Sequence, residues 1–265
     1  MPFTQVGTQT ISYDEYGQGQ PLLLIPGLSA WRLYWWKQIT PFSQKYHLIT
    51  MDNRDVGDST SAKGPYTIAD MADDAAGLIS NLHLGPTQVI GWSMGSFISL
   101  EMTLRHPTLV DKLILVSTSA GGLNHIPPSP EIIALLLGTE YENIETRVRS
   151  IYSVISGPGY MQTHPEDLDQ IVRHAQAKPM TLEAYMRQLN AIMTWSGVGE
   201  RLDQITLPTM VIHGETDPLV TYPNGRYLAE HIKGAKLMSY AGVGHLPHIE
   251  ATERFNNDVL EFLAS

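Results

Sequence analysis

Short, continuous apolar runs recur along the chain and predict strands that are buried on both faces. The runs occupy residues 22–25, 46–52, 87–92, 113–116, 210–212 and 236–240. A strand with one face in water alternates polar and apolar residues, whereas a strand covered on both faces is apolar throughout. The first run, Leu22-Leu23-Leu24-Ile25, ends at Pro26-Gly27, which interrupts the strand. The pattern therefore predicts a central sheet that other elements cover on each side.

Between these runs, apolar residues recur at spacings of three and four, which predicts amphipathic helices. The clearest example covers residues 68–82. Thr67 suits the N-cap of this helix, Asp70 follows three residues later, and Gly85-Pro86 ends the pattern. A last helix is expected around residues 255–263. Such alternation of strands and helices is typical of the α/β class, with a mostly parallel central sheet flanked by helices.

One long stretch interrupts this alternation. About 90 residues separate the strand that ends near Ser117 from the strand that begins near Pro208, and they carry helical patterns without a convincing strand. Connections between elements are usually much shorter, roughly 2–6 residues. Helices are expected at 129–138, 142–156, 165–177 and 181–195. We therefore expect a core made of residues 1–120 and 201–265, with residues 121–200 inserted as a helical lid over the carboxyl-terminal edge of the sheet.

The composition narrows the possible functions. The 265 residues include no cysteine, which excludes thiol catalysis, disulfide bonds and cysteine zinc sites. The formal net charge of −10 argues against nonspecific binding of nucleic acid, which needs a cationic surface. No apolar run reaches the roughly 18 residues of a membrane span, and the first residues lack a signal-peptide pattern. These features favour a soluble, cytoplasmic enzyme. We also expect a monomer or homodimer that acts on a small molecule without a metal or cofactor, although composition does not decide the oligomeric state.

The segment Gly91-Trp92-Ser93-Met94-Gly95 is the strongest local signal for chemistry. It follows a predicted strand and precedes a predicted helix, so the serine is expected on a tight, strained turn known as a nucleophile elbow. Glycine is needed two residues to either side because larger residues would collide there. The turn exposes the hydroxyl at a helix N-terminus, whose amides face developing negative charge. Ser93 is therefore the candidate nucleophile.

A serine hydroxyl needs a base, and His245 has the most suitable context of the ten histidines. It lies between the last predicted strand and the last helix, in a loop where Gly242 and Gly244 give the chain freedom to reach a cleft. His248 is the rival in the same loop. The alternative interpretation of His248 is structural: it would lie at the start of a helix and pack against the lid or bond Glu250.

The base in turn needs a carboxylate that fixes its tautomer and stabilises the imidazolium. Asp217 lies in the turn after the strand at 210–212 and is followed by Pro218. Glu215 is the alternative carboxylate, but it lies next to Gly214, where the chain is still turning. We therefore predict Asp217 as the residue that orients His245.

The negative charge on a tetrahedral intermediate needs backbone N–H donors, an oxyanion hole. One donor is expected from Met94, directly after the nucleophile. The other is expected from the turn after the first predicted strand, at Leu28, with Ser29 as the alternative. Gly27 is compatible with an oxyanion-hole turn, and it is equally compatible with an ordinary turn.

At this point the chain resembles the α/β-hydrolase family over essentially its whole length. The resemblance rests on Gly91 to Gly95, on the turn from Gly214 to Pro218, and on the loop from Gly244 to Glu250. The order serine, aspartate, histidine is also that of the family. The segment from Asp52 to Ser59 resembles the D-x-R-G-x-G-x-S loop of the family, with Asp55 where glycine is usual.

Two departures accompany the resemblance. The Asp55 variant is similar to one in bacterial methyl-esterases that act on polyketide antibiotics. Pro26-Gly27 stands where many members have His-Gly, which leaves open what replaces the contacts of that imidazole.

A serine at position 93 implies acyl transfer, because relatives that open epoxides or displace halide carry aspartate there. We therefore expect a serine hydrolase, of the carboxylesterase type, that cleaves carboxylic esters through an acyl-enzyme. Lactonases, carbon–carbon bond hydrolases and cofactor-free perhydrolases resemble the same scaffold and remain alternatives. A further alternative is a small-molecule receptor that turns over slowly while its lid signals to a partner.

Substrate choice is expected to depend on the lid and the pocket walls. The predicted substrate contacts are Trp31, Trp92, Met186 and Trp195, and the lid adds Met161, Met180, Met193, Tyr160 and Tyr185. Methionines suit an adaptable apolar pocket. Together these residues indicate a medium-sized, apolar ester or lactone. The substrate is expected to be largely uncharged, because the lid has no clear basic cluster for a carboxylate or phosphate, although Arg147, Arg149, Arg173 and Arg187 are candidates.

Overall fold

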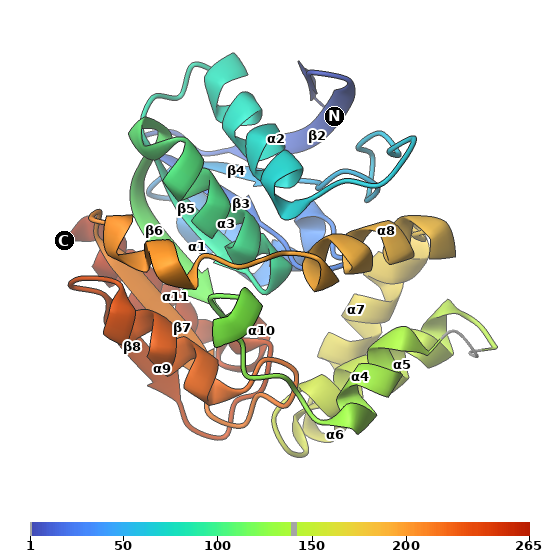
Figure 1. The fold of residues 1–265 in the computed structure, drawn as a ribbon. Coiled ribbons are helices and arrows are strands. Elements are labelled where there is room, and N and C mark those ends of the chain that lie inside the picture. Colours follow the sequence, from blue (N-terminus) through green and yellow to red (C-terminus); the bar gives the residue numbers. More distant parts are fainter. Residues whose placement is uncertain (1, 139–141) are drawn as a thin grey trace.

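An eight-stranded sheet forms the centre of the described structure (Figure 1). The computed structural model describes residues 2–138 and 142–265. The strands lie in the order β1-β2-β4-β3-β5-β6-β7-β8. Their bounds are β1 Phe3–Val6, β2 Gln9–Tyr16, β3 Pro21–Ile25, β4 His47–Met51, β5 Thr87–Trp92, β6 Val110–Val116, β7 Thr209–Gly214 and β8 Lys236–Tyr240. The strands from β3 to β8 pair in parallel, which confirms the predicted mostly parallel sheet.

The first two strands are missing from the sequence prediction. β1 and β2 form an antiparallel hairpin, and β2 pairs antiparallel with β4. Gly7 in the hairpin turn has a φ of 55°, a conformation that favours glycine. Residues of β1 alternate between exposed and half-buried positions, so this strand carries no apolar run. The hairpin forms one edge of the sheet, at the opposite side from β7 and β8.

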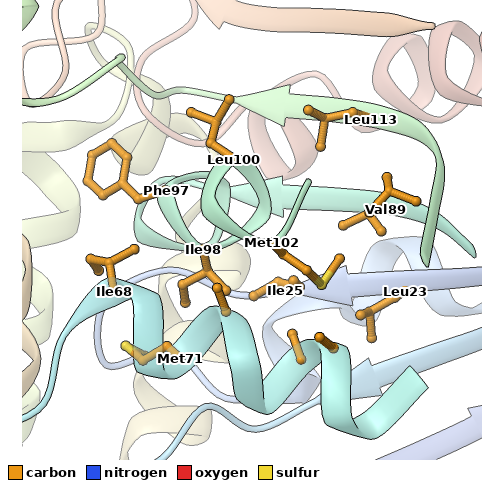
Figure 2. Packing of buried hydrophobic residues seen from close by; sticks show 14 of the residues in the cluster. Leu23, Ile25, Ile68, Met71, Val89, Phe97, Ile98, Leu100, Met102 and Leu113 are labelled. Atoms are coloured by element: carbon orange, nitrogen blue, oxygen red, sulfur yellow. The ribbon is translucent and has the colours of Figure 1, made fainter. Parts of the chain in front are cut away.

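Successive residues of each parallel strand belong to two separate apolar clusters, which cover the two faces of the sheet. In β3, Leu23 and Ile25 pack with residues of α2 and α3 (Figure 2). Leu22 and Leu24 belong to the other cluster, which includes residues of α1 and α11. The helices outside the insertion are α1 Trp36–Ser43, α2 Ile68–Asn81, α3 Met94–Arg105, α9 Tyr222–His231, α10 Pro247–Glu250 and α11 Thr252–Ala264. Short 3-10 helices occupy Arg32–Trp35, Pro107–Leu109, Gly122–Asn124 and Gly199–Gln204.

The start of α2 follows its predicted cap. The Thr67 hydroxyl accepts a hydrogen bond from the Asp70 N–H at 3.1 Å, and the Asp70 carboxylate accepts one from the Thr67 N–H at 2.8 Å. This reciprocal capping box satisfies two N–H groups that the first turn of a helix leaves without partners. The helix ends at Asn81, ahead of Gly85-Pro86.

The stretch between β6 and β7 is helical, as the sequence predicts. Its helices are α4 Pro130–Leu137, α5 Ile144–Ile155, α6 Tyr160–Thr163, α7 Pro165–Ala177 and α8 Leu182–Met193. We call residues 121–200 the helical insertion. The short helix α6 is missing from the prediction, and residues 139–141 lie outside the described residues. Within residues 2–138 and 142–265, no helix is long and apolar enough to cross a membrane.

The two ends of the helical insertion meet at its base. The Val198 N–H donates a hydrogen bond to the Ala120 carbonyl oxygen at 2.8 Å. Gly121 and Gly197 have φ values of 69° and 79°, and a Cβ on Gly197 would lie 2.4 Å from the carbonyl carbon of Gly121. Glycine is needed at both positions because the two chain segments touch there.

Candidate active site

Ser93 lies on a sharp turn between β5 and α3. Its φ of 56° and ψ of −120° lie in a region that residues with a side chain rarely adopt. A Cβ on Gly91 would lie 2.4 Å from the Gly95 carbonyl oxygen, and a Cβ on Gly95 would lie 2.1 Å from that of Ile25. Close approach of backbone therefore requires both glycines. The turn leaves the Ser93 side chain at the N-terminus of α3.

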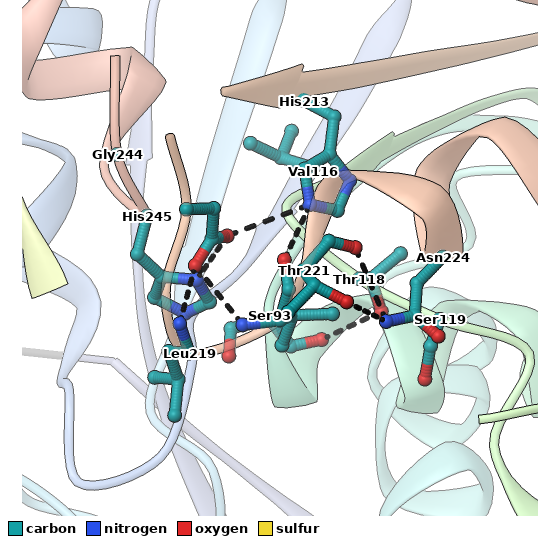
Figure 3. A network of polar contacts seen from close by, with 12 residues as sticks. Ser93, Val116, Thr118, Ser119, His213, Leu219, Thr221, Asn224, Gly244 and His245 are labelled. Atoms are coloured by element: carbon teal, nitrogen blue, oxygen red, sulfur yellow. Dashed lines mark hydrogen bonds and ion pairs between the residues drawn. The ribbon is translucent and has the colours of Figure 1, made fainter. Parts of the chain in front are cut away.

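Asp217 follows β7, and hydrogen bonds fix both of its carboxylate oxygens. Oδ1 accepts hydrogen bonds from the N–H groups of Leu219 and Val220 at 2.8 and 3.0 Å. Oδ2 accepts one from Nδ1–H of His245 at 2.8 Å (Figure 3). Asp217 and His245 are both buried. Because Nδ1 of His245 carries the proton in this contact, Nε2 of the neutral ring can accept another.

The carboxyl of Asp217 is held in its charged form. Burial alone would raise its pKa, but the charge of His245 and hydrogen bonds from His213 and His245 lower the pKa to about 2. Nε2 of His213 lies 3.5 Å from Asp217 Oδ2 and donates its proton to the Val220 carbonyl oxygen at 2.7 Å. Asp217 is therefore ionised at neutral pH and stabilises a positive charge on His245.

The loop that carries His245 is anchored to the elbow and to the helical insertion. The indole N–H of Trp92, the residue before Ser93, donates to the His245 carbonyl oxygen at 2.9 Å. The His245 N–H donates to the carbonyl oxygen of Ile155, the last residue of α5, at 2.8 Å. The position of the histidine thus depends on contacts from both parts of the molecule.

Glu250 connects the same loop to the insertion. Its carboxylate accepts hydrogen bonds from the N–H groups of Gly244 and Leu246, each at 3.0 Å, and of Gly157 at 2.7 Å. Gly244 and Leu246 flank His245, and Gly157 lies just after α5. Burial raises the pKa of the Glu250 carboxyl, although these amides act in the opposite direction.

His248, the alternative base, and Glu215, the alternative carboxylate, have surroundings that differ from those of His245 and Asp217. His248 is completely buried, with its ring centroid 4.9 Å from that of Trp35 and 4.6 Å from that of Trp92. Both of its ring nitrogens lack a hydrogen-bond partner among the described residues, so the ring does not bond Glu250. Burial lowers the pKa of His248 well below its ordinary value. Glu215 is exposed at the surface of its turn.

A cavity under the helical insertion contains both Ser93 and His245. Its lining consists of Leu28, Ser29, Tyr34, Trp92, Ser93, Leu136, Ile144, Arg147, Val148, Ile151, Tyr152, Ile155, Ala175, Lys178, Met180, Tyr185, Leu219 and His245. Most of these side chains are apolar, and most come from the insertion. In the described part of the chain, no group of three or more His, Asp or Glu side chains is arranged to hold a metal ion.

The turn after β3 approaches the nucleophile. A Cβ on Gly27 would lie 3.2 Å from the Cβ of Ser93. The Ser29 N–H donates to Gln188 Oε1 at 2.9 Å, whereas the Leu28 N–H has no acceptor among the described residues. The Met94 N–H lies in the first turn of α3, where N–H groups have no partner within the helix. The N–H groups of Leu28 and Met94 are therefore both available beside Ser93.

Comparisons with known proteins identify the family of the chain. The sequence model of the alpha/beta hydrolase fold family matches residues 20–252. The chain belongs to the α/β-hydrolase family. A Rhizobium rhizogenes protein that carries the name of a carbamate hydrolase, RutD, is 28% identical over 257 residues, which cover 95% of this chain and 97% of that protein.

Two further relatives are named as enol-lactonases. The 3-oxoadipate enol-lactonase 2 of Acinetobacter baylyi is 26% identical over 251 residues, 94% of this chain and 91% of its own. The crystal structure of the enol-lactonase from Burkholderia xenovorans LB400 matches with a TM-score of 0.88 at 25% identity, and each chain is covered to 100%. With its family and these relatives, this α/β-hydrolase is a hydrolytic enzyme.

The Asp55 departure from the α/β-hydrolase pattern has a structural explanation. Asp55 has a φ of 72°, the conformation for which glycine is usual. Its carboxylate forms a two-pronged ion pair with Arg187 of α8, at 2.7 and 2.9 Å, and also accepts from the Ala62 N–H at 2.8 Å. The aspartate therefore ties the loop after β4 to the insertion.

The second departure from the family pattern is Pro26. Its carbonyl oxygen accepts a hydrogen bond from the side-chain amide of Asn53 at 3.0 Å, and Asn53 is buried. This contact supports the turn before Leu28 where many members of the family have a histidine.

Of the four predicted substrate contacts, Trp92 lines the cavity and the other three lie outside its lining. The Trp31 indole is buried and donates to the His174 carbonyl oxygen at 3.1 Å. The Trp195 ring packs on Phe97 and its N–H donates to Glu101 at 2.9 Å. Met186 lies on the outer surface of α8 and is 41% exposed. Residue type alone did not reveal the direction of these side chains.

The sequence prediction missed most of the cavity wall. Ile144, Val148, Ile151, Tyr152 and Ile155 of α5 all line the cavity. Their spacings of three and four place them on one face of the helix, a signal that the sequence already contains. Tyr34 and Lys178 also line the cavity, and no local pattern distinguishes them.

Proposed function

We propose that the protein is a serine hydrolase that cleaves carboxylic esters through an acyl-enzyme. The proposal is supported chiefly by one arrangement: His245 is bonded to buried Asp217 and lines the same cavity as Ser93, which occupies a strained elbow. A base oriented by a carboxylate and a serine at a helix N-terminus are the parts that acyl transfer requires.

In the first half of the proposed reaction, Ser93 Oγ attacks the ester carbonyl carbon while its proton passes to His245 Nε2. The carbonyl π electrons move to oxygen, and the N–H groups of Leu28 and Met94 bind this oxyanion. The intermediate collapses, the bond to the alkoxy group breaks, and the imidazolium returns its proton to the departing alcohol. Asp217 stabilises the imidazolium throughout.

In the second half, water replaces the alcohol. His245 Nε2 accepts a proton from water as its oxygen attacks the acyl carbon, and the same N–H groups bind the second oxyanion. Collapse of this intermediate breaks the bond to Ser93 Oγ, which regains its proton from His245. The products are an alcohol and a carboxylic acid.

A second candidate activity is lactone hydrolysis, in which the alcohol and the acid are released as one molecule. The specific observation in its favour is the likeness over the full chain to a structure described as an enol-lactonase. Both candidates use the same residues in the same order.

The test is a series of p-nitrophenyl esters from acetate to dodecanoate, assayed beside a small lactone panel. We expect multiple turnovers with one preferred chain length, because the cavity is apolar and enclosed by the insertion. Ser93→Ala is expected to lower kcat/KM at least about 10³-fold without loss of the folded state. Circular dichroism and thermal unfolding report whether the fold is kept.

Ser29→Ala is a matched control, because Ser29 lines the same cavity and its N–H remains in the variant. It should retain most of the activity. More than one hundredth of wild-type activity in Ser93→Ala would contradict the nucleophile assignment. Stoichiometric release followed by a stall would favour a slow-turnover receptor instead.

A further inference from the structure

Four arginines of the helical insertion could bind a negatively charged substrate group, and protein side chains already engage three of them. Arg149 bonds Glu145 at 2.8 Å and Asp169 at 2.6 Å. Arg173 donates twice to Gln170 Oε1, at 2.6 and 3.1 Å. Arg187 forms the two-pronged ion pair with Asp55. The fourth arginine, Arg147, differs from them.

The side chain of Arg147 has no hydrogen bond or ion pair with any described residue. Its guanidinium carbon lies 4.0 Å from the centroid of the Tyr185 ring, so the planar group stacks on the aromatic face. Nη2 is buried and has no hydrogen-bond partner in the described part of the chain. A buried donor on a charged group that lacks a partner costs free energy, which indicates that a ligand supplies the partner.

The position of Arg147 within α5 supports this conclusion. The face of α5 that lines the cavity is otherwise apolar or aromatic, and Arg147 lies on it between Ile144 and Ile151. A solvated arginine would lie on the opposite face of an amphipathic helix. Arg147 instead lines the same cavity as Ser93 and His245.

The other charged groups of the cavity are already compensated. Lys178 pairs with Asp58, and His245 pairs with Asp217. Tyr34 and Tyr152 add no negative charge, since burial raises the pKa of both phenols. Among the described residues, the cavity therefore holds one positive charge that no acidic side chain compensates.

We propose that Arg147 binds a carboxylate of the substrate, so that the enzyme acts on esters or lactones that carry a free acid group. The apolar wall contacts the carbon skeleton, and the stacked guanidinium offers its edge to the two carboxylate oxygens. This inference rests on the proposed hydrolysis at Ser93 and adds the class of substrate.

The experiment compares two matched pairs of esters. The first pair is mono-p-nitrophenyl adipate and its methyl ester, which differ by one charge on the acyl side. The second pair is 4-acetoxybutanoate and its methyl ester, in which the charge lies on the alcohol side. We expect the wild-type enzyme to favour the charged member of one pair.

Arg147→Gln should lower kcat/KM for the favoured charged ester about 10- to 100-fold, the range expected for losing a charge-assisted hydrogen bond. Its effect on the uncharged member should stay within about 3-fold, because the reacting groups are unchanged. Arg147→Lys should keep part of the preference, since it retains the charge but not the planar fork. Arg149→Gln is the matched control, because it removes the same charge from the same helix, and it should leave both pairs unchanged.

The outcomes separate this inference from the proposed reaction. Equal activity on both members of each pair, or an equal loss on both in Arg147→Gln, would overturn the carboxylate site while leaving the hydrolase standing. If no ester is hydrolysed, calorimetric binding to Ser93→Ala decides. Tighter binding of a charged ester that disappears in Ser93→Ala/Arg147→Gln would uphold the site without the reaction, and no such preference would overturn the site as well.

Discussion

The loops at the carboxyl edge of the sheet and the helical insertion build opposite sides of one cavity by different means. At the sheet edge, each oxygen of Asp217 has hydrogen-bond partners, and His245 is bonded through its ring, its N–H and its carbonyl oxygen. In the insertion, α5 lines the cavity with aliphatic and aromatic side chains and one guanidinium, whose Nη2 has no hydrogen-bond partner among the described residues. Directional hydrogen bonds fix the side chains at the sheet edge, whereas the insertion presents a mostly apolar surface to the cavity.

This difference suggests how the two regions divide the work. Proton transfer requires a geometry that hydrogen bonds can impose. Apolar contact is not directional, so it selects a substrate by size and polarity. Changes at the sheet edge should therefore lower the rate for every substrate alike, whereas changes in the insertion should alter the order of preference among substrates.

Asp217→Asn is expected to give the largest effect of this kind. The amide cannot hold the Nδ1–H tautomer of His245 or stabilise its charge, so kcat should fall about 10³- to 10⁴-fold. The decrease should be the same along the p-nitrophenyl ester series, which steady-state kinetics would show. Glu215→Gln removes a neighbouring, exposed carboxylate and should be nearly silent. Comparable losses in the two variants would reject the choice of Asp217.

Glu250→Gln addresses the connection between the two regions. Both oxygens of this carboxylate accept N–H groups, so an amide would place an NH₂ group against a backbone donor. We expect kcat to fall about 10-fold, because a lost partner for a buried donor costs on the order of 1–3 kcal/mol. KM should change less, since the groups that contact the substrate remain.

The exposed residue Glu253, in the first turn of α11, provides a control as Glu253→Gln. A change in chain-length preference with unchanged kcat in Glu250→Gln would mean that Glu250 shapes the insertion and does not position His245.

His248→Phe should give the smallest effect on activity and a measurable one on stability. Burial keeps His248 neutral in the folded protein, while the unfolded chain binds a proton as pH falls below about 6.5. The lowered pKa means that the contribution of His248 to stability is present above that pH and lost as pH falls below it. His248→Phe should remove this loss.

Urea unfolding between pH 7 and pH 4.5 would measure that change. The slope of the free energy of unfolding against pH should decrease by up to about 1.4 kcal/mol per pH unit, the value for one proton. His231→Phe, at an exposed position in α9, should leave the slope unchanged. An unaltered slope in His248→Phe would mean that His248 can take up its proton in the folded state.

Local sequence signals predicted the central strands and the turn that carries Ser93. Gly91 avoids a contact with Gly95 four residues later, and Gly95 avoids one with Ile25 of β3, but the two glycines lie at a fixed spacing around Ser93 and are visible in the sequence itself. The hairpin of β1 and β2 was missed because a half-exposed edge strand carries no apolar run. The direction of Trp31 and Trp195 depends on distant partners, which residue type does not encode.

The pair formed by Asp55 and Arg187 illustrates the same limit. The two residues are separated by 132 positions in the chain, and only folding brings them together. The unusual aspartate was evident in the sequence, whereas its partner was not. The sequence named Arg147 only as one of four candidate arginines, although its position on an apolar helical face distinguishes it from Arg149 of the same helix.

The hydrogen bond between Val198 and Ala120 at the base of the helical insertion has a consequence for how such enzymes evolve new specificity. Since the chain leaves and rejoins the sheet at adjacent points, a segment of another length or composition could be spliced between Gly121 and Gly197 without shifting β6 or β7. The graft would have to reproduce only the few contacts that reach the His245 loop, such as those of Ile155 and Gly157. Related enzymes could therefore change substrate by exchanging the insertion while they keep the residues of the sheet edge that carry out the reaction.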